Sequence, residues 1–149
     1  MTTDHQTVKV YMVVAGDYHD MDHARLELLK LCAEHETMRV QVAANYHDLD
    51  AIKQCDVLIS YTCNVVPEQN EQEALRDFVR SGKKWFALHG TNSILEFIEG
   101  GVDAPETAPV VMETLGTQFL AHPPIQPFTV TASDQEHELV KGIGEFETD

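Results

Sequence analysis

The sequence predicts a single α/β domain over residues 1–149, because strand-like and helix-like segments alternate along most of the chain. The strand-like runs are β-branched and almost continuously apolar, which is typical of strands buried on both faces of a parallel sheet. The runs between them carry apolar residues at helical spacing. Such alternation gives parallel sheets with right-handed crossovers. It favours a flavodoxin-like, three-layer α/β/α architecture with a mostly parallel sheet.

Four segments are expected to build the main sheet, in the spatial order second, first, third, fourth. They are residues 8–15, 38–43, 56–61 and 84–88. A further strand is expected at residues 127–132. It is expected at a sheet edge, because Pro127 cannot donate a backbone hydrogen bond to a neighbouring strand.

Two longer helices and one short helix are expected between and after these strands. The first is capped by Asp20 or Asp22, and its buried stripe is Ala24, Leu28, Leu31 and Cys32. The second has Pro67 in its first turn and ends at Gly82. Its buried face is Ala74, Leu75, Phe78 and Val79. The short helix lies near residues 110–115, after an excursion rich in glycine and proline.

The charge balance is strongly acidic, with 25 Asp and Glu residues against 10 Lys and Arg residues and a formal net charge of −15. This charge argues against binding to nucleic acid backbones and to anionic membrane surfaces. It would also repel phosphorylated or carboxylate substrates. A small neutral molecule such as a sugar is the partner class that fits the charge best.

The cysteine pattern favours reduced thiols in a cytoplasmic protein. Cys32, Cys55 and Cys63 are odd in number and form no CxxC pair, so neither a disulfide framework nor a zinc knuckle is indicated. The sequence shows no signal peptide and no apolar run of membrane-spanning length. We therefore expect neither secretion nor a membrane partner.

Polar side chains follow three of the predicted strands, at residues 16–20, 62–64 and 89–93. In open α/β sheets, ligands bind outside the carboxyl ends of the strands, and the expected strand order places these three loops side by side. His89 and His19 are the candidate catalytic residues, because an imidazole can serve as an acid, a base or a metal ligand. The candidate ligand-binding residues are Asp17, Asn64, Asn92, Ser93 and His122.

Three of these histidines form a candidate metal site. His19, His89 and His122, with a water molecule, would make a catalytic zinc set, although no local spacing motif such as HExxH supports it. Cys63 also follows a strand, but no basic residue next to it in the sequence would activate its thiol, which favours a buried structural role. Serine hydrolase elbows, P-loops and dinucleotide fingerprints are absent from the sequence.

The chain resembles the trehalose-utilisation (ThuA-like) proteins, a branch of the class I glutamine amidotransferase-like superfamily. The similarity lies in the order and spacing of short pieces across nearly the whole chain. They are residues 16–20, 56–59, 86–93, 122–123, 128–130, 134–137, 142–143 and 146–149. The resemblance implies a flavodoxin-like fold and a role in carbohydrate metabolism.

Two departures from the superfamily pattern matter for function. Amidotransferases carry a nucleophilic cysteine in the turn after the fourth strand, whereas this turn is His89-Gly90-Thr91, so glutaminase chemistry is not expected. ThuA-like chains also usually continue past a segment like residues 146–149, so the fold is expected to be shortened at its C-terminus.

The leading hypothesis is a ThuA-like domain that acts on or binds a sugar or sugar derivative through His89 and His19. One alternative is a non-catalytic interaction domain that keeps the fold, which a homo-oligomer would favour. A second is a metal-binding, hydrolase-like protein. A third is a redox or metal sensor that uses Cys63 with nearby histidines.

Overall fold

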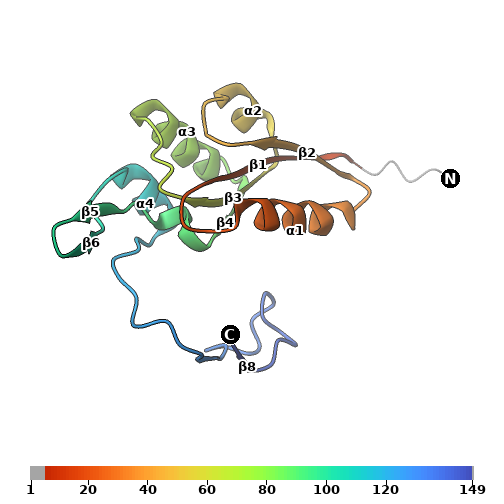
Figure 1. Ribbon diagram of the computed structural model, residues 1–149. Coiled ribbons are helices and arrows are strands. Elements are labelled where there is room, and N and C mark those ends of the chain that lie inside the picture. The colour runs from red at the N-terminus through yellow and green to blue at the C-terminus, as the bar shows by residue number, and fades with distance from the viewer. Residues whose placement is uncertain (1–5, 149) are drawn as a thin grey trace.

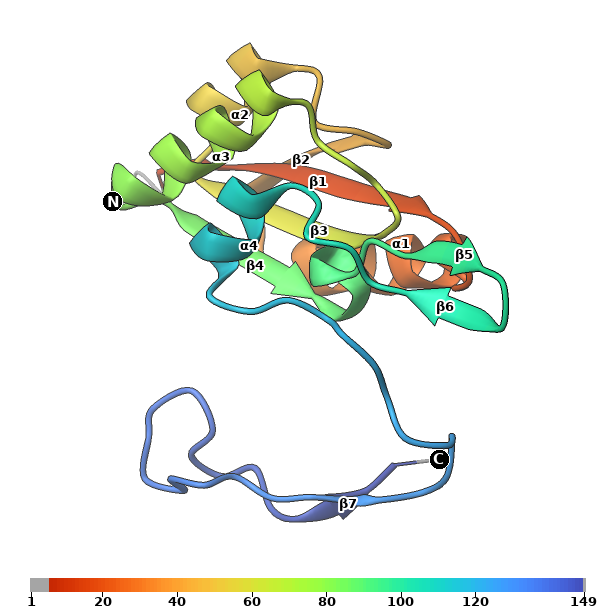
Figure 2. The same cartoon turned by 90° about the vertical axis from the view of Figure 1, so that its left-hand side faces the viewer.

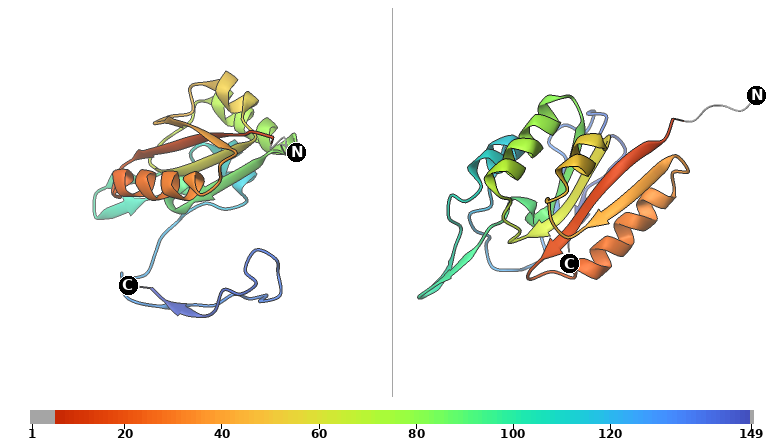
Figure 3. Two further views of the ribbon diagram at one scale, coloured as in Figure 1. Left: turned by 90° about the vertical axis from the view of Figure 1, so that its right-hand side faces the viewer. Right: turned by 90° about the horizontal axis from the view of Figure 1, so that it is seen from above.

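The computed structural model describes residues 6–148, in which a four-stranded parallel sheet lies between two helical layers (Figures 1 and 3). The strand order is β2-β1-β3-β4, which confirms the predicted order. The strands are β1 (Val8–Gly16), β2 (Met38–Ala43), β3 (Val57–Cys63) and β4 (Lys84–Leu88). The sequence therefore predicted the flavodoxin-like α/β/α architecture correctly.

Helix α1 (Met21–Ala33) covers one face of the sheet, and α2 (Leu49–Gln54), α3 (Gln69–Arg80) and α4 (Pro109–Leu115) cover the other. The alternation of side chains along each strand decides this division. On β1, Val10, Met12 and Val14 pack with Cys32 of α1. Tyr11 and Val13 point the other way, into the core that contains Ile52, Leu75, Phe78, Val111 and Met112. Each layer is thus held by its own hydrophobic core.

Local signals fix the ends of the first and third helices. Asp20 caps α1, because its carboxylate accepts a hydrogen bond of 2.8 Å from the His23 backbone N–H. Gly82 follows α3 with a φ of 87°, the left-handed conformation that glycine adopts at low cost. Pro67 lies just before the N-cap, Glu68, and so two positions before the first helical residue, Gln69, which corrects its predicted place in the first turn.

Two further sequence predictions need correction. Leu31 is 48% exposed, because the buried face of α1 is rotated toward Met21 and Leu29, which pack on the sheet instead. The short helix α2 is absent from the sequence-based prediction. Its six residues are too few to show a clear helical period, although Asp48 caps it through the Ala51 backbone N–H at 2.9 Å.

The remaining elements lie outside the main sheet. A hairpin of β5 (Glu96–Ile98) and β6 (Gly101–Asp103) follows η1 (His89–Asn92), a single turn of 3-10 helix. The segment after α4 runs away from the sheet (Figures 1 and 2). Its strands β7 (Thr129–Val130) and β8 (Phe146–Glu147) pair with each other. The predicted strand at 127–132 is therefore shorter than expected and does not join the main sheet, because its backbone partners come from residues 146–148.

Within residues 6–148, none of the helices has both the length and the apolar character that crossing a membrane requires.

The loop before α2 is tied to α3 by a histidine–carboxylate contact. The His47 Nδ1 atom contacts the Glu71 Oε1 atom, and Glu71 is 3% exposed at the start of α3. The other carboxylate oxygen of Glu71 accepts a hydrogen bond of 2.7 Å from the Glu68 backbone N–H. This contact raises the pKa of His47 above its ordinary value of 6.5, chiefly through the hydrogen bond and then through the negative charge of Glu71.

The stability of the protein should therefore depend on pH through His47. Because the folded-state pKa is raised, the contact stabilises the fold fully below the unfolded pKa of about 6.5, and this contribution is lost as the pH rises through the folded-state pKa. We expect the urea midpoint of the wild type to fall over that window relative to His47→Ala. His35→Ala, which changes another exposed histidine, should keep the wild-type profile. Parallel profiles for wild type and His47→Ala would contradict this account.

Candidate functional site

The carboxyl ends of β1, β3 and β4 lie side by side, because β3 pairs with β1 on one side and with β4 on the other. The β1–β3 register runs from Val10 opposite Val57 to Gly16 opposite Cys63. The loops that leave these strand ends are therefore neighbours in space, as the sequence predicted. This edge is where ligands bind in open α/β sheets.

Backbone strain is concentrated in the same three loops. Tyr18, Asn64 and His89 have φ values of 68°, 60° and 46°, in the left-handed region that residues other than glycine rarely adopt. Each lies at or just beyond the end of a different strand. Ala108, before α4, is the other such residue in the described part of the chain. Conformations of this kind cost free energy and tend to cluster at functional sites.

Two glycines let the loops approach the end of β3. A Cβ atom on Gly16 would lie 1.8 Å from the Cys63 carbonyl oxygen, and one on Gly90 would lie 2.7 Å from the Thr62 carbonyl oxygen. The Asp17 backbone N–H also donates to the Cys63 carbonyl at 3.1 Å. The Thr91 hydroxyl lies 2.8 Å from the Leu88 carbonyl oxygen and 3.1 Å from that of Ser60. These contacts hold both histidine loops against β3.

His19 and His89 meet at this edge. Their Nε2 atoms are 3.1 Å apart, and their rings lie edge to face with centroids at 4.4 Å. The Tyr61 ring, at the end of β3, stacks on His89 with a centroid distance of 5.7 Å. A hydrogen bond between two Nε2 atoms requires one imidazole to donate and the other to accept. Burial, followed by the neighbouring His89, lowers the pKa of His19 below its ordinary value.

His19 and His89 line a pocket of about 640 Å³ at the carboxyl ends of the strands, called here the strand-end pocket. Its polar lining comes mainly from the loop after β4 and includes Asn92 and Ser93. Its apolar lining comes from the β5–β6 hairpin and from residues 119–128. The other lining side chains are Tyr18, Cys63, Gly90, Leu95, Phe97, Val102, Phe119, His122, Pro123, Pro124, Ile125, Gln126 and Phe128. Among the described residues, no Asp, Glu, Lys or Arg lines this pocket.

The predicted binding residues divide into two groups. Asn92, Ser93 and His122 line the pocket with the two catalytic candidates. Asn64 and Asp17 lie outside its lining. The Asn64 side-chain oxygen accepts a hydrogen bond of 2.7 Å from the Leu95 backbone N–H, so this amide holds the loop that leads to the hairpin. The Asn92 side chain donates to the Thr117 hydroxyl at 3.3 Å and so also links η1 to the later segment.

The three histidines proposed as a metal set do not form one group. Across residues 6–148, no cluster of three or more His, Cys, Asp or Glu side chains is close enough to hold a metal ion. His122 lines the pocket, but its Nδ1 lies 2.7 Å from the Pro123 carbonyl oxygen and its ring packs on Phe119. The pair of His19 and His89 is the part of the set that the fold brings together.

Cys63 has the surroundings of a structural thiol. It is 2% exposed at the end of β3, and burial raises the pKa of its thiol, an effect that a hydrogen bond from Ser93 partly offsets. A raised pKa keeps the sulfur protonated at neutral pH, whereas a nucleophilic cysteine needs a lowered one.

Several site residues were missed by the sequence reasoning. Tyr61 and Tyr18 belong to the strand end and loop already singled out, so their positions offered a signal. Phe97 and Phe119 offered none, because their places depend on the path of the hairpin and on the contact of Phe119 with Asn92. Tyr18 and Phe97 pack edge to face with centroids at 5.7 Å.

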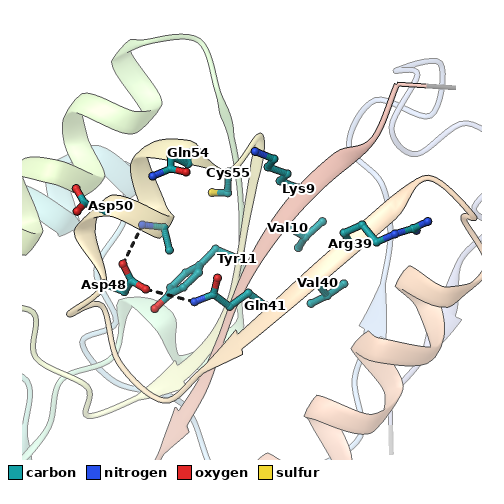
Figure 4. A pocket seen from close by; sticks show the side chains of 11 residues that line it. Lys9, Val10, Tyr11, Arg39, Val40, Gln41, Asp48, Asp50, Gln54 and Cys55 are labelled. Atoms are coloured by element: carbon teal, nitrogen blue, oxygen red, sulfur yellow. Dashed lines mark hydrogen bonds between the residues drawn. The ribbon is translucent and has the colours of Figure 1, made fainter. Parts of the chain in front are cut away.

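A second cavity of about 470 Å³ lies between β1, β2 and α2 (Figure 4). Its lining carries both signs of charge, from Lys9, Arg39, Asp48 and Asp50. Figure 4 shows the Asp48 carboxylate bonded to Gln41, at 3.3 Å, and to the Ala51 backbone N–H. The Asp48 carboxylate therefore already serves to cap α2. The strand-end pocket is the better functional candidate because it combines the histidine pair with the strained loops.

Fold and site together define a flavodoxin-like α/β domain with a histidine pair at the carboxyl ends of its parallel strands. The chain belongs to the ThuA family, since the family model described as trehalose utilisation matches residues 7–149. Among solved structures, a protein from Bacteroides uniformis ATCC 8492 that is described as ThuA-like has a similar fold, with a TM-score of 0.70 at 17% identity. The match covers 99% of this chain and 60% of that protein. A comparison with curated protein sequences finds no match.

The close approach of Gly16 to β3 predicts a large stability cost for Gly16→Ala. The new methyl group would overlap the Cys63 carbonyl, and the φ of 119° would be strained. We expect the free energy of unfolding to fall by about 3 kcal/mol or more. Gly82→Ala is the matched control, because it has a φ of 87° but open space around it, and should cost only about 1 kcal/mol. Equal costs in urea denaturation would contradict the close-approach account.

Proposed function

We propose that this ThuA-family domain binds and acts on a small neutral molecule rich in hydroxyl groups, a sugar or sugar derivative, in the strand-end pocket. The observation that carries the proposal is the pair of imidazoles, supplied by two loops far apart in the sequence, with Nε2 atoms 3.1 Å apart. Membership of a family described as trehalose utilisation supports the same substrate class. The uncharged lining of the pocket, in a chain with a net charge of −15, supports a neutral ligand.

In the leading mechanism the two imidazoles act as an acid–base pair. One ring can donate a proton while the other accepts one, so together they can move a proton to or from a substrate hydroxyl. Tyr61 stacks on His89 and fixes the orientation of that ring. Asn92 and Ser93, which also line the pocket, would hydrogen-bond the remaining hydroxyl groups.

Replacing either histidine should disable the site. With trehalose and glucose as probes, we expect His19→Ala and His89→Ala each to weaken binding about tenfold or more, and to lower any turnover by about 10²-fold or more. Calorimetry measures the binding, and mass spectrometry of the sugar measures the turnover. His35→Ala removes a distant exposed histidine and should match the wild type. Wild-type behaviour in both site variants would rule the proposal out.

A second candidate function uses the same pair as ligands for a divalent transition-metal ion such as zinc. Two metal–nitrogen bonds of about 2.0–2.1 Å, at an angle between a right angle and the tetrahedral angle, place their nitrogens about 2.9–3.4 Å apart. The observed 3.1 Å falls within this range. When bound, such an ion would polarise a substrate oxygen. His19 and His89 would hold it, with the remaining positions left to water or substrate.

Cobalt titration distinguishes the two candidates. If the pair holds a metal, untagged wild-type protein should develop a visible Co²⁺ absorption band that His19→Ala and His89→Ala lose and His35→Ala keeps. Sugar binding should then disappear after chelator treatment. If the pair works as an acid and a base, no band forms, and the chelator-treated protein keeps its affinity for the sugar probes.

A further inference from the structure

The lining of the strand-end pocket changes character from one part to another. The histidine pair, Asn92 and Ser93 come from the loops at the strand ends. The rest of the lining is mostly apolar, with His122 and Gln126 as its polar members. Its main contributors are Leu95, Phe97 and Val102 from the hairpin region, and Phe119, Ile125 and Phe128 from the later segment. A ligand that fills the pocket therefore meets polar partners beside the strand-end loops, and hydrocarbon or aromatic surface beside the hairpin and the later segment.

Two aromatic rings of this apolar part are largely exposed and lie in contact. Tyr18 is 56% exposed and Phe97 is 68% exposed, yet they pack edge to face with centroids at 5.7 Å. They come from different elements, the loop after β1 and strand β5. Large apolar side chains that gather in a concave, accessible site mark a place where a ligand removes them from water.

The later segment reaches the pocket at a defined point. The Phe119 backbone N–H donates to the Asn92 carbonyl at 3.0 Å, and the Phe119 ring lines the cavity. One backbone hydrogen bond thus joins the start of the later segment to η1, the turn that carries His89. Phe119 is therefore positioned relative to the histidine pair by a hydrogen bond as well as by hydrophobic contact.

We propose that the ligand is amphiphilic, with a hydroxylated ring at His19 and His89 and a flat apolar substituent against Tyr18 and Phe97, as in an aryl glycoside. This inference rests on the proposed function and deepens it. A second sugar ring would fit the apolar part less well, because its hydroxyl groups would lose water without gaining enough hydrogen-bond partners. The pocket volume of about 640 Å³ is in the range of pockets that hold a drug-sized ligand. The described lining offers no Asp, Glu, Lys or Arg to pair with a charged substituent, which favours an uncharged one.

The test compares two probes that share the sugar and differ in the substituent, 4-nitrophenyl glucoside and methyl glucoside, each as both anomers. Calorimetry on the wild type should give at least about tenfold tighter binding of the nitrophenyl probe. Phe97→Ala should remove most of this advantage, measured as the ratio of the two affinities in the same variant. Tyr18→Asn, which suits the left-handed backbone at that position, should do the same from a separate loop.

Phe86→Ala is the matched control, because Phe86 is a 49% exposed phenylalanine on β4 that does not line the pocket. It should leave both affinities at wild-type values. Equal affinity for the two probes in the wild type would overturn the inference, as would an advantage that survives in both Phe97→Ala and Tyr18→Asn. In those cases, methyl glucoside binding that depends on His19 and His89 would still uphold the proposed function. Failure of both probes to bind would overturn the two proposals together.

Discussion

The parallel pairing of β1 with β3 is the constraint on which the rest of the molecule depends. Its register ends with Gly16 opposite Cys63, where a side chain on the glycine would overlap the backbone of β3. This contact brings the loop after β1 over the end of β3. Because β4 pairs with the other edge of β3, the loop after β4 arrives at the same place. The two cores on either side of the sheet fix the strands that deliver both loops.

The strand-end loops combine strain with close packing. Left-handed residues at three strand ends, together with two glycines pressed against β3, fix the backbone that carries the two histidines. Such constraint costs stability, and the sheet and its buried layers compensate for it. In return, the imidazole nitrogens are held at a distance suited to proton transfer or to metal binding before any ligand arrives. Preorganisation of this kind is what a catalytic or binding pair requires.

Charge is distributed in a way that suits the same site. The chain carries 25 acidic residues, yet none of the described lining of the strand-end pocket is acidic. The acidic surface would disfavour anionic compounds at a distance, while the uncharged pocket favours a neutral molecule at close range. The pocket uses hydrogen-bonding groups at the strand ends and apolar surface elsewhere, and these two properties together define the ligand proposed for it.

The sequence by itself determined the positions of the four main strands, the two main helices and the loops that carry the site, because strand and helix periodicity and glycine punctuation are local signals. The strand order followed from the usual order of this fold class. The sequence also indicated His19 and His89, which follow buried strands. Only the tertiary structure decided that these two rings meet, that Asn64 and Asp17 lie outside the pocket lining, and that Phe97 and Phe119 complete it. Those outcomes depend on left-handed turns, sheet register and the path of the hairpin. Such features join residues as far as 70 positions apart, so no local pattern encodes them.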